Sequence, residues 1–147
     1  MSDPLLTTSS PTTTSAPLHR KVLVAIETAM AVFGLGGGIM LISGNGTPAV
    51  DAIASLGLTS WVVPGLWLTA SVAIPSAAAA YLASRRSSWT PRAVLLASGL
   101  LAVELLVQVP FLGVNGLQVA MASIGGTAAA LAWRGRHTWG PASPSLW

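Results

Sequence analysis

Four long apolar stretches dominate this sequence. They cover residues 22–42, 61–82, 93–112 and 117–133, and each contains 17 to 22 residues. A helix needs about 20 apolar residues to cross the hydrocarbon core of a bilayer. Only 7% of the 147 residues are charged, whereas about a quarter are charged in a soluble domain. The sequence therefore predicts an all-α, polytopic membrane protein whose four transmembrane helices pack as a bundle, and it excludes a soluble globular domain.

The basic residues indicate the topology. All seven lie before the first stretch, between the second and third, or after the fourth: Arg20, Lys21, Arg85, Arg86, Arg92, Arg134 and Arg136. With four spans these segments share one side, and Lys and Arg gather on the cytoplasmic side. We predict a multi-pass protein of the bacterial cytoplasmic (inner) membrane with both termini in the cytoplasm. Because topology explains the net charge of +3, we expect the lipid bilayer as a partner and no nucleic acid.

The composition divides the chain into three parts. Residues 1–21 are rich in Ser, Thr and Pro and are predicted to form a disordered cytoplasmic head. Residues 22–133 form the transmembrane domain, and residues 134–147 form a cytoplasmic tail. In the loop after the first span, Thr47 and Pro48 resemble a helix cap followed by a first-turn proline, which predicts a short helix along the membrane surface.

Two ionisable residues lie inside the predicted spans, Glu27 and Glu104. An ionisable group in the hydrocarbon is costly and is by default a candidate functional residue. A rise of about 1.5 Å per residue separates the two by about 9 Å along the membrane normal, too far for a carboxylate pair. The same counting gives each glutamate its own polar neighbours: Ser76, Ser98 and Thr127 for Glu27, and Ser71, Ser123 and the one-turn neighbour Gln108 for Glu104.

Small residues follow one face of the first and last spans. Gly34 and Gly38 form a pair at a spacing of four, as do Ala122 and Gly126. Such pairs let two helices approach closely in a membrane. We interpret both as helix-packing residues; the alternative is that the face beside Glu27 leaves a narrow polar cavity.

Nothing in the sequence indicates a catalytic residue, a metal site or a cofactor. The chain has no cysteine, and its two histidines, His19 and His137, lie outside the spans without neighbouring metal ligands. We therefore expect no bound metal and no cofactor.

Several short motifs resemble those of a known group. The segments Ser60-Trp61-Val62-Val63-Pro64-Gly65 and Ala73-Ile74-Pro75, followed by Gly99 and Glu104, resemble small uncharacterised four-span integral membrane proteins of actinobacteria. A looser similarity extends to DoxX-type four-helix membrane proteins. The resemblance implies an inner-membrane four-helix fold and assigns no catalytic residues.

Three functions are compatible with these features. The first is a membrane bundle without a catalytic site that associates with itself, as a homo-oligomer, or with a larger membrane complex. The second is a proton-coupled small-molecule transporter that uses Glu27, since a glutamate in the first of four spans resembles the small multidrug resistance exporters in outline. The third is an intramembrane enzyme acting on a lipid or isoprenoid through Glu104 and Gln108. We favour the first because small-residue faces are plentiful and aqueous loops are short.

Overall fold

The computed structural model describes residues 15–45 and 47–136, and in this part of the chain the regular structure is entirely helical. The elements in chain order are α1 (Ser15–Ser43), the 3-10 helix η1 (Val50–Leu56), α2 (Val62–Leu68), the π turn η2 (Thr69–Ala73), α3 (Ile74–Ser84), α4 (Thr90–Leu112) and α5 (Gly116–Gly135). Because α2, η2 and α3 continue into one another, they form a single long helix.

The all-α prediction is confirmed. The described residues contain four helices long and apolar enough to cross a membrane: Leu18–Ser43, Val62–Ser84, Thr90–Leu112 and Gly116–Gly135. Most of their bounds extend beyond the predicted spans, although the second helix begins at Val62, one residue later than predicted. The largest difference is at α1, which begins at Ser15 rather than at residue 22. Thus 15–21, counted with the disordered head in the prediction, are helical. Pro17 lies in the first turn of α1, where a proline is tolerated because an N–H there has no partner within the helix. The rest of the predicted head, and the tail from residue 137, lie outside the described residues.

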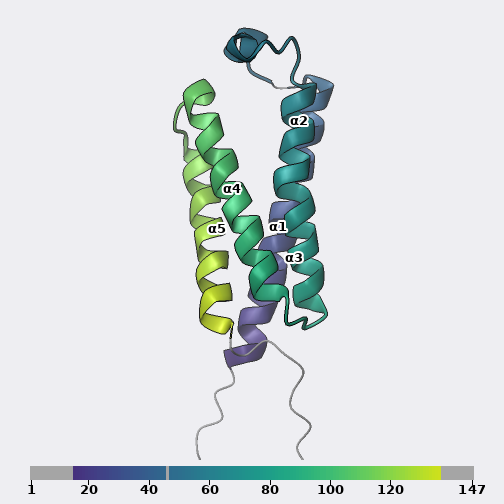
Figure 1. Ribbon diagram of the computed structural model, residues 1–147, viewed down its shortest axis with the longest axis vertical. Coiled ribbons are helices and arrows are strands. Elements are labelled where there is room, and N and C mark those ends of the chain that lie inside the picture. Colours follow the sequence, from purple (N-terminus) through teal and green to yellow (C-terminus); the bar gives the residue numbers. More distant parts are fainter. Residues whose placement is uncertain (1–14, 46, 137–147) are drawn as a thin grey trace, which may run out of the picture.

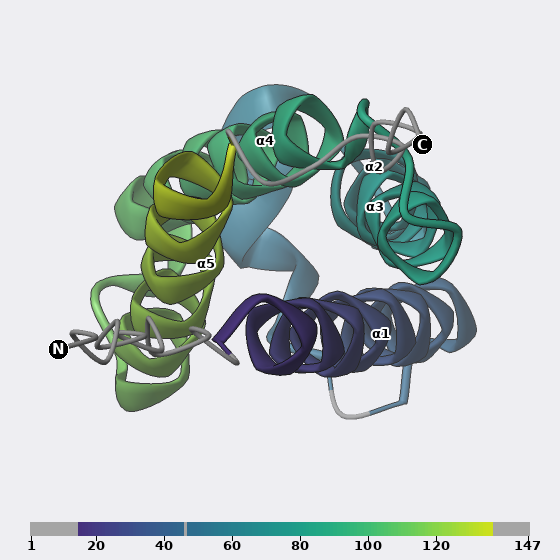
Figure 2. The same ribbon diagram turned by 90° about the horizontal axis from the view of Figure 1, so that it is seen from below.

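The four long helices lie side by side and alternate in direction (Figure 1). Seen along their length, they form a ring in the order α1, α2–α3, α4 and α5 (Figure 2). The helix α1 packs chiefly against α2, η2 and α3, and α4 packs chiefly against α5 and α3. Short connections between consecutive helices produce this arrangement, because they make sequence neighbours into spatial neighbours.

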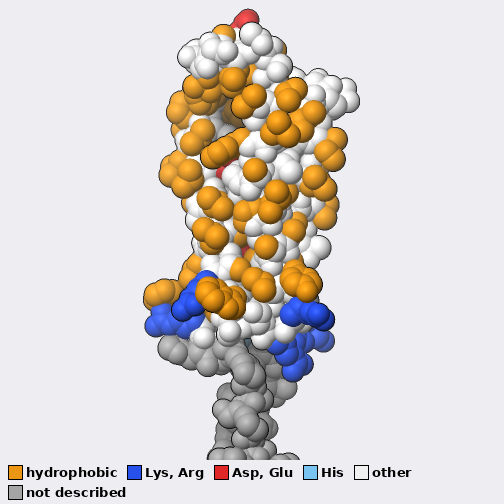
Figure 3. All heavy atoms as spheres, turned by 45° about the vertical axis from the view of Figure 1, so that its right-hand side comes forward, with side chains coloured by type: hydrophobic (Ala, Val, Ile, Leu, Met, Phe, Trp, Pro, Cys, Tyr) orange, Lys and Arg blue, Asp and Glu red, His pale blue; other side chains and the backbone are white. Residues whose placement is uncertain are grey.

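The basic side chains gather at one end of the molecule, which we call the basic end (Figure 3). Three of the arginines lie over aromatic rings of their own helices or loops. The guanidinium carbon is 5.7 Å from the ring centre in the pair Arg85–Tyr81, 4.8 Å in Arg92–Trp89 and 3.9 Å in Arg136–Trp133. Cation–π attraction stabilises such pairs, so three arginines at this end are each paired with an aromatic ring.

The other end, which we call the distal end, is covered by η1 (Figure 1). The predicted short helix is present, but the predicted cap is wrong: Ala49 occupies the N-cap position, and the Thr47 hydroxyl instead donates to the Gly44 carbonyl at 3.4 Å. The side chain of Ile53 is only 2% exposed. Trp61, just before α2, holds the start of the loop in place: its Nε1 donates to the Pro48 carbonyl at 2.9 Å.

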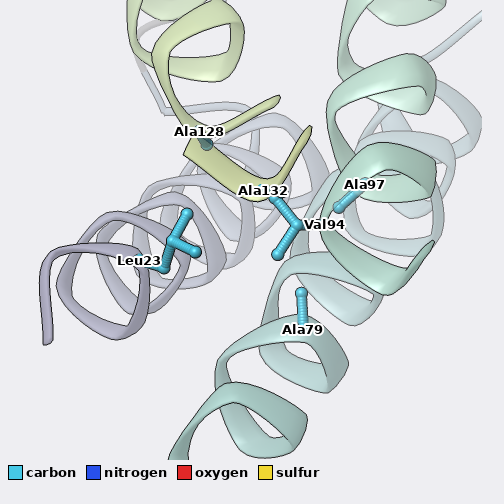
Figure 4. Close-up of a cluster of buried hydrophobic side chains, with 6 residues drawn as sticks. All are labelled: Leu23, Ala79, Val94, Ala97, Ala128 and Ala132. Carbon is cyan, nitrogen blue, oxygen red and sulfur yellow. The ribbon is translucent and has the colours of Figure 1, made fainter. Parts of the chain in front are cut away.

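The core is tightest near the basic end. Small side chains from four helices converge there around two larger ones, and none is more than 3% exposed (Figure 4): Leu23, Ala79, Val94, Ala97, Ala128 and Ala132. A second cluster, of Met30, Val72 and Leu101, follows toward the distal end. Since alanine side chains let the backbones approach closely, the helices are held together at the basic end.

Candidate functional site: a cavity beside Glu104

Glu104 lies midway along α4 and is buried, with 6% of its surface exposed. Two side chains contact its carboxyl group. Gln108 Nε2, one turn further along α4, donates to Oε1 at 3.0 Å. The Ser71 hydroxyl, from the neighbouring span, lies 3.3 Å from Oε2; its single hydrogen is shared with the Trp67 carbonyl, which it approaches more closely, at 2.8 Å. The structure thus brings together three of the polar residues that the sequence singled out.

Ser71 reaches Glu104 from the π turn η2. In this turn the N–H of Ile74 donates to the carbonyl of Thr69, five residues earlier. The next residue is Pro75, which has no N–H and whose ring would clash in an α-helix with the carbonyl of Ser71, four residues before it. A π turn is wider than an α turn and accommodates the proline ring.

The π turn also brings two serines to the inside of the molecule. In an uninterrupted α-helix Ser71 and Ser76 would point about 140° apart, so they would not both face inward. In the structure they are 7% and 4% exposed. Each serine therefore contacts a different glutamate. Ser71 contacts Glu104, and Ser76 lies within hydrogen-bonding reach of Glu27.

Gln118 extends the polar network to α5, and sequence reasoning missed it. Its Nε2 lies 3.5 Å from Gln108 Oε1, a long hydrogen bond. Asn115 holds Gln118 in place through a capping box at the start of α5: Asn115 Oδ1 accepts from the N–H of Gln118, and Gln118 Oε1 accepts from the N–H of Asn115. An Asn followed three residues later by Gln at a helix start is the signal that identifies such a box.

These polar groups line one side of a cavity of about 210 Å³ in the distal half of the molecule. Its remaining walls are mainly apolar and come from α1, α2, η2, α4 and α5. They include Met30, Phe33, Leu68, Val72, Leu101, Leu105, Leu112, Leu117 and Met121, together with Gly34 and Gly37 of α1. A concave apolar space with a few convergent polar groups is the usual form of a small-molecule site.

Glu27 does not line this cavity. It lies nearer the basic end of α1, between the two core clusters, and is 2% exposed. Ser76 is its hydrogen-bonding neighbour. The two glutamates thus have separate surroundings, in line with the separation that the helical rise predicts.

The other predicted polar candidates lie elsewhere. Ser98 donates to the Gly125 carbonyl at 3.1 Å and links α4 to α5. Ser123 and Thr127 are exposed, and each donates at 2.8 Å to the carbonyl four residues earlier in α5. None of the three contacts Glu104 or lines its cavity.

Gly34 and Gly38 of α1 lie in close contact with the α2–η2 segment. A methyl group at Gly34 would come within 3.0 Å of the backbone nitrogen of Ala73. At Gly38 it would overlap the Thr69 hydroxyl and come within 2.9 Å of the Gly65 carbonyl. This small-residue face is therefore occupied within the chain.

The small residues of α5 behave differently. Ala122 and Gly126 are exposed, and no side-chain or neighbouring-helix atom lies within 4 Å of a methyl group placed on Gly126. Both line a second, outward-facing hollow of about 370 Å³ between α4 and α5. The internal contact of α5 uses Gly125, where a methyl group would come within 2.7 Å of Leu101 Cδ2.

The cavity has few polar groups, and they gather on one side. Its polar lining consists of one carboxyl group and the amides of Gln108, Asn115 and Gln118. Among the described residues no group of three His, Cys, Asp or Glu side chains is placed to hold a metal ion. The arrangement supplies hydrogen bonds and one acidic group to a molecule in the cavity.

Comparisons with family models, curated proteins and solved structures gave no match to this chain. The role of each residue therefore rests on the geometry described above.

Proposed function

We propose that this chain is a multi-pass protein of the bacterial cytoplasmic membrane, packed as a four-helix transmembrane bundle with both termini and the Arg85–Arg92 loop in the cytoplasm. Two observations support this. Large apolar side chains point outward on the long helices, among them Phe33, Leu66 and Leu106 at 61%, 57% and 71% exposed. The Lys and Arg residues all belong to one end, as the positive-inside rule requires of a cytoplasmic face.

Within the membrane, the proposed function is binding rather than catalysis. The observation that carries it is the cavity at Glu104, where a buried carboxyl group and three amides converge on an otherwise apolar space. No buried side-chain atom of this network is without a partner, but the two oxygens of the carboxyl group offer more acceptor positions than its two contacts use, and a bound molecule can occupy those that remain. An intramembrane enzyme using Glu104 is less well supported, because no second carboxyl group among the described residues lines the cavity.

The test is whether a small molecule accompanies the protein and depends on the cavity. Wild-type protein from its own membranes is compared with Met121→Trp, which fills the cavity, and with Met40→Trp, placed on an exposed part of α1. We expect native mass spectrometry in mild detergent to detect one bound molecule in wild type and in Met40→Trp, and none in folded Met121→Trp. Equal occupancy in all three, or no bound molecule in wild type, would contradict the proposal.

Self-association is a second candidate function. Its surface would differ from the one that the sequence suggested. Since Gly34 and Gly38 face α2–η2 within the chain, the available small-residue surface is the hollow between α4 and α5. A second helix fits such a surface because small residues permit close backbone approach. Gly126→Leu should then reduce oligomer size in light scattering, whereas Gly36→Leu, on an open part of α1, should not; equal sizes would exclude this surface.

Proton-coupled transport through Glu27 is a third candidate. A cavity in the distal half and a tight core at the basic end resemble one state of a transporter that opens to each side in turn. Glu27 lies on the closed side of the cavity and is almost fully buried. Substrate-driven proton movement in vesicles, lost in Glu27→Gln, is the result that would establish this function.

A further inference from the structure

We propose that the molecule bound in this cavity is a small apolar amine, held by an ion pair between its ammonium group and Glu104. This inference rests on the proposed binding function and specifies its ligand. It follows from the charge around Glu104, from the hydrogen-bonding capacity that its contacts leave unused, and from the size and lining of the cavity.

Glu104 has no positive counter-charge near it in the described chain. All seven Lys and Arg residues lie near the start of α1, at the α3–α4 connection or at the end of α5, and these segments make up the basic end. The nearest on the same helix is Arg92, twelve residues earlier, which corresponds to about 18 Å along the helix axis. Among the described residues the other buried ionisable side chain is Glu27, which is also acidic. A cationic ligand would supply the opposite charge that is missing beside Glu104, whereas an anionic ligand would find no positive side chain to pair with.

The contacts of Glu104 leave room for an ammonium group. A carboxylate has two oxygens and about four acceptor positions. Gln108 and Ser71 each occupy one of them. The Oε1 atom of Gln108 accepts only a long hydrogen bond from Gln118. An ammonium group donates three hydrogen bonds, so the remaining acceptors on Glu104 and Gln108 match its capacity.

The cavity limits the size and shape of the ligand. Its volume of about 210 Å³ is below the roughly 300–1,000 Å³ of sites for drug-sized molecules. The walls opposite the polar network are side chains such as Met30, Phe33 and Met121, which favour a short hydrocarbon or single-ring body. The structure thus fits an amine with one polar end and a compact apolar body.

Hexylamine, hexanol and hexanoate test this inference because they share a chain length and differ in charge. Near pH 7 an alkylamine is protonated, as a lysine side chain is. Binding to the full-length protein in detergent is measured from the concentration dependence of its thermal stabilisation, since a ligand that binds only the folded state stabilises it by RT ln(1 + [L]/Kd). The proteins compared are wild type, Glu104→Gln, Glu104→Asp, Glu27→Gln and Met121→Trp.

We expect wild type and Glu27→Gln to bind hexylamine at least tenfold more tightly than they bind hexanol, and to reject hexanoate. Folded Glu104→Gln should lose that preference, and Glu104→Asp, which keeps the charge, should retain part of it. Met121→Trp should bind none of the three. Loss of amine binding in Glu27→Gln alone would move the site to Glu27 and overturn the inference.

Two further results separate this inference from the function on which it rests. If hexanol or hexanoate binds as tightly as hexylamine, and Met121→Trp abolishes that binding, the cavity is a binding site but its ligand is not an amine. If Met121→Trp binds the three compounds as wild type does, or if none of them binds to wild type, both the amine and the use of this cavity are wrong.

Discussion

Gly38 and Gly65 bring α1 and α2 into direct backbone contact. A methyl group on Gly65 would come within 2.7 Å of the Gly38 carbonyl oxygen, and one on Gly38 within 2.9 Å of the Gly65 carbonyl oxygen. The Thr69 hydroxyl, which donates to the Gly65 carbonyl at 3.0 Å, fills the remaining space. A contact in which two carbonyls and a hydroxyl meet leaves no room for a side chain on either glycine.

This contact predicts a large cost for side chains at Gly38. Gly38→Leu should lower the free energy of unfolding by about 3 kcal/mol, the upper end for overpacking a well-packed core, because backbone rather than a flexible side chain must move. Gly36→Leu, where nothing lies within 4 Å, is the matched control and should change stability little. Thermal unfolding in one detergent measures both variants, and similar melting temperatures would show that α1 and α2 do not pack in this way.

The network at Glu104 predicts opposite outcomes for two substitutions. Glu104→Gln keeps an acceptor for Gln108 and gains an N–H for Ser71, so its stability should stay within about 1 kcal/mol of wild type. Glu104→Leu removes the acceptor and leaves the amide of Gln108 unpaired, at a cost of about 1–3 kcal/mol. The comparison is made by thermal unfolding of purified protein. A Leu variant as stable as the Gln variant would mean that these hydrogen bonds contribute nothing to folding.

Thr90 provides a stabilising prediction. It is fully buried at the start of α4, and its Oγ1 has no hydrogen-bond partner among the residues that the structure describes. A buried hydroxyl without a partner costs roughly 1–3 kcal/mol, and valine has nearly the same shape without the hydroxyl. Thr90→Val should therefore raise the melting temperature. Thr90→Ser, which keeps the hydroxyl and loses the methyl group, should lower it; a less stable Val variant would indicate that the hydroxyl has a partner.

Single cysteines test the membrane topology cleanly because the chain has none of its own. Ser55→Cys lies in η1 at the distal end, and Ser88→Cys lies in the α3–α4 loop at the basic end; both positions are exposed. An impermeant thiol reagent should label Ser55→Cys in intact cells and Ser88→Cys only after the membrane is opened. The reverse pattern would place the basic end outside and refute the cytoplasmic termini.

The sequence by itself determined the helical class, the four apolar segments and the single basic end. Each depends on local composition: apolar runs of sufficient length form helices, and the positions of Lys and Arg along the chain fix which helix ends share a side. The separation of Glu27 from Glu104 also follows from the sequence, because the rise per residue is constant along a helix. Gln108 was found as a partner of Glu104 for the same reason, since it lies one turn further along.

The tertiary structure decided which polar groups meet across helices. The π turn at Thr69–Ala73 rotates the second half of the span, so that Ser71 contacts Glu104 and Ser76 contacts Glu27. A helical wheel with a constant turn of about 100° per residue does not predict this rotation. The rotation of α5 turns Gly125 inward and Gly126 outward, and its capping box carries Gln118 to Gln108. The cavity exists because small side chains from four helices fill the core near the basic end, whereas the larger side chains of α1, α2, α4 and α5 toward the distal end leave a space between them, and only the packed arrangement sets that spacing.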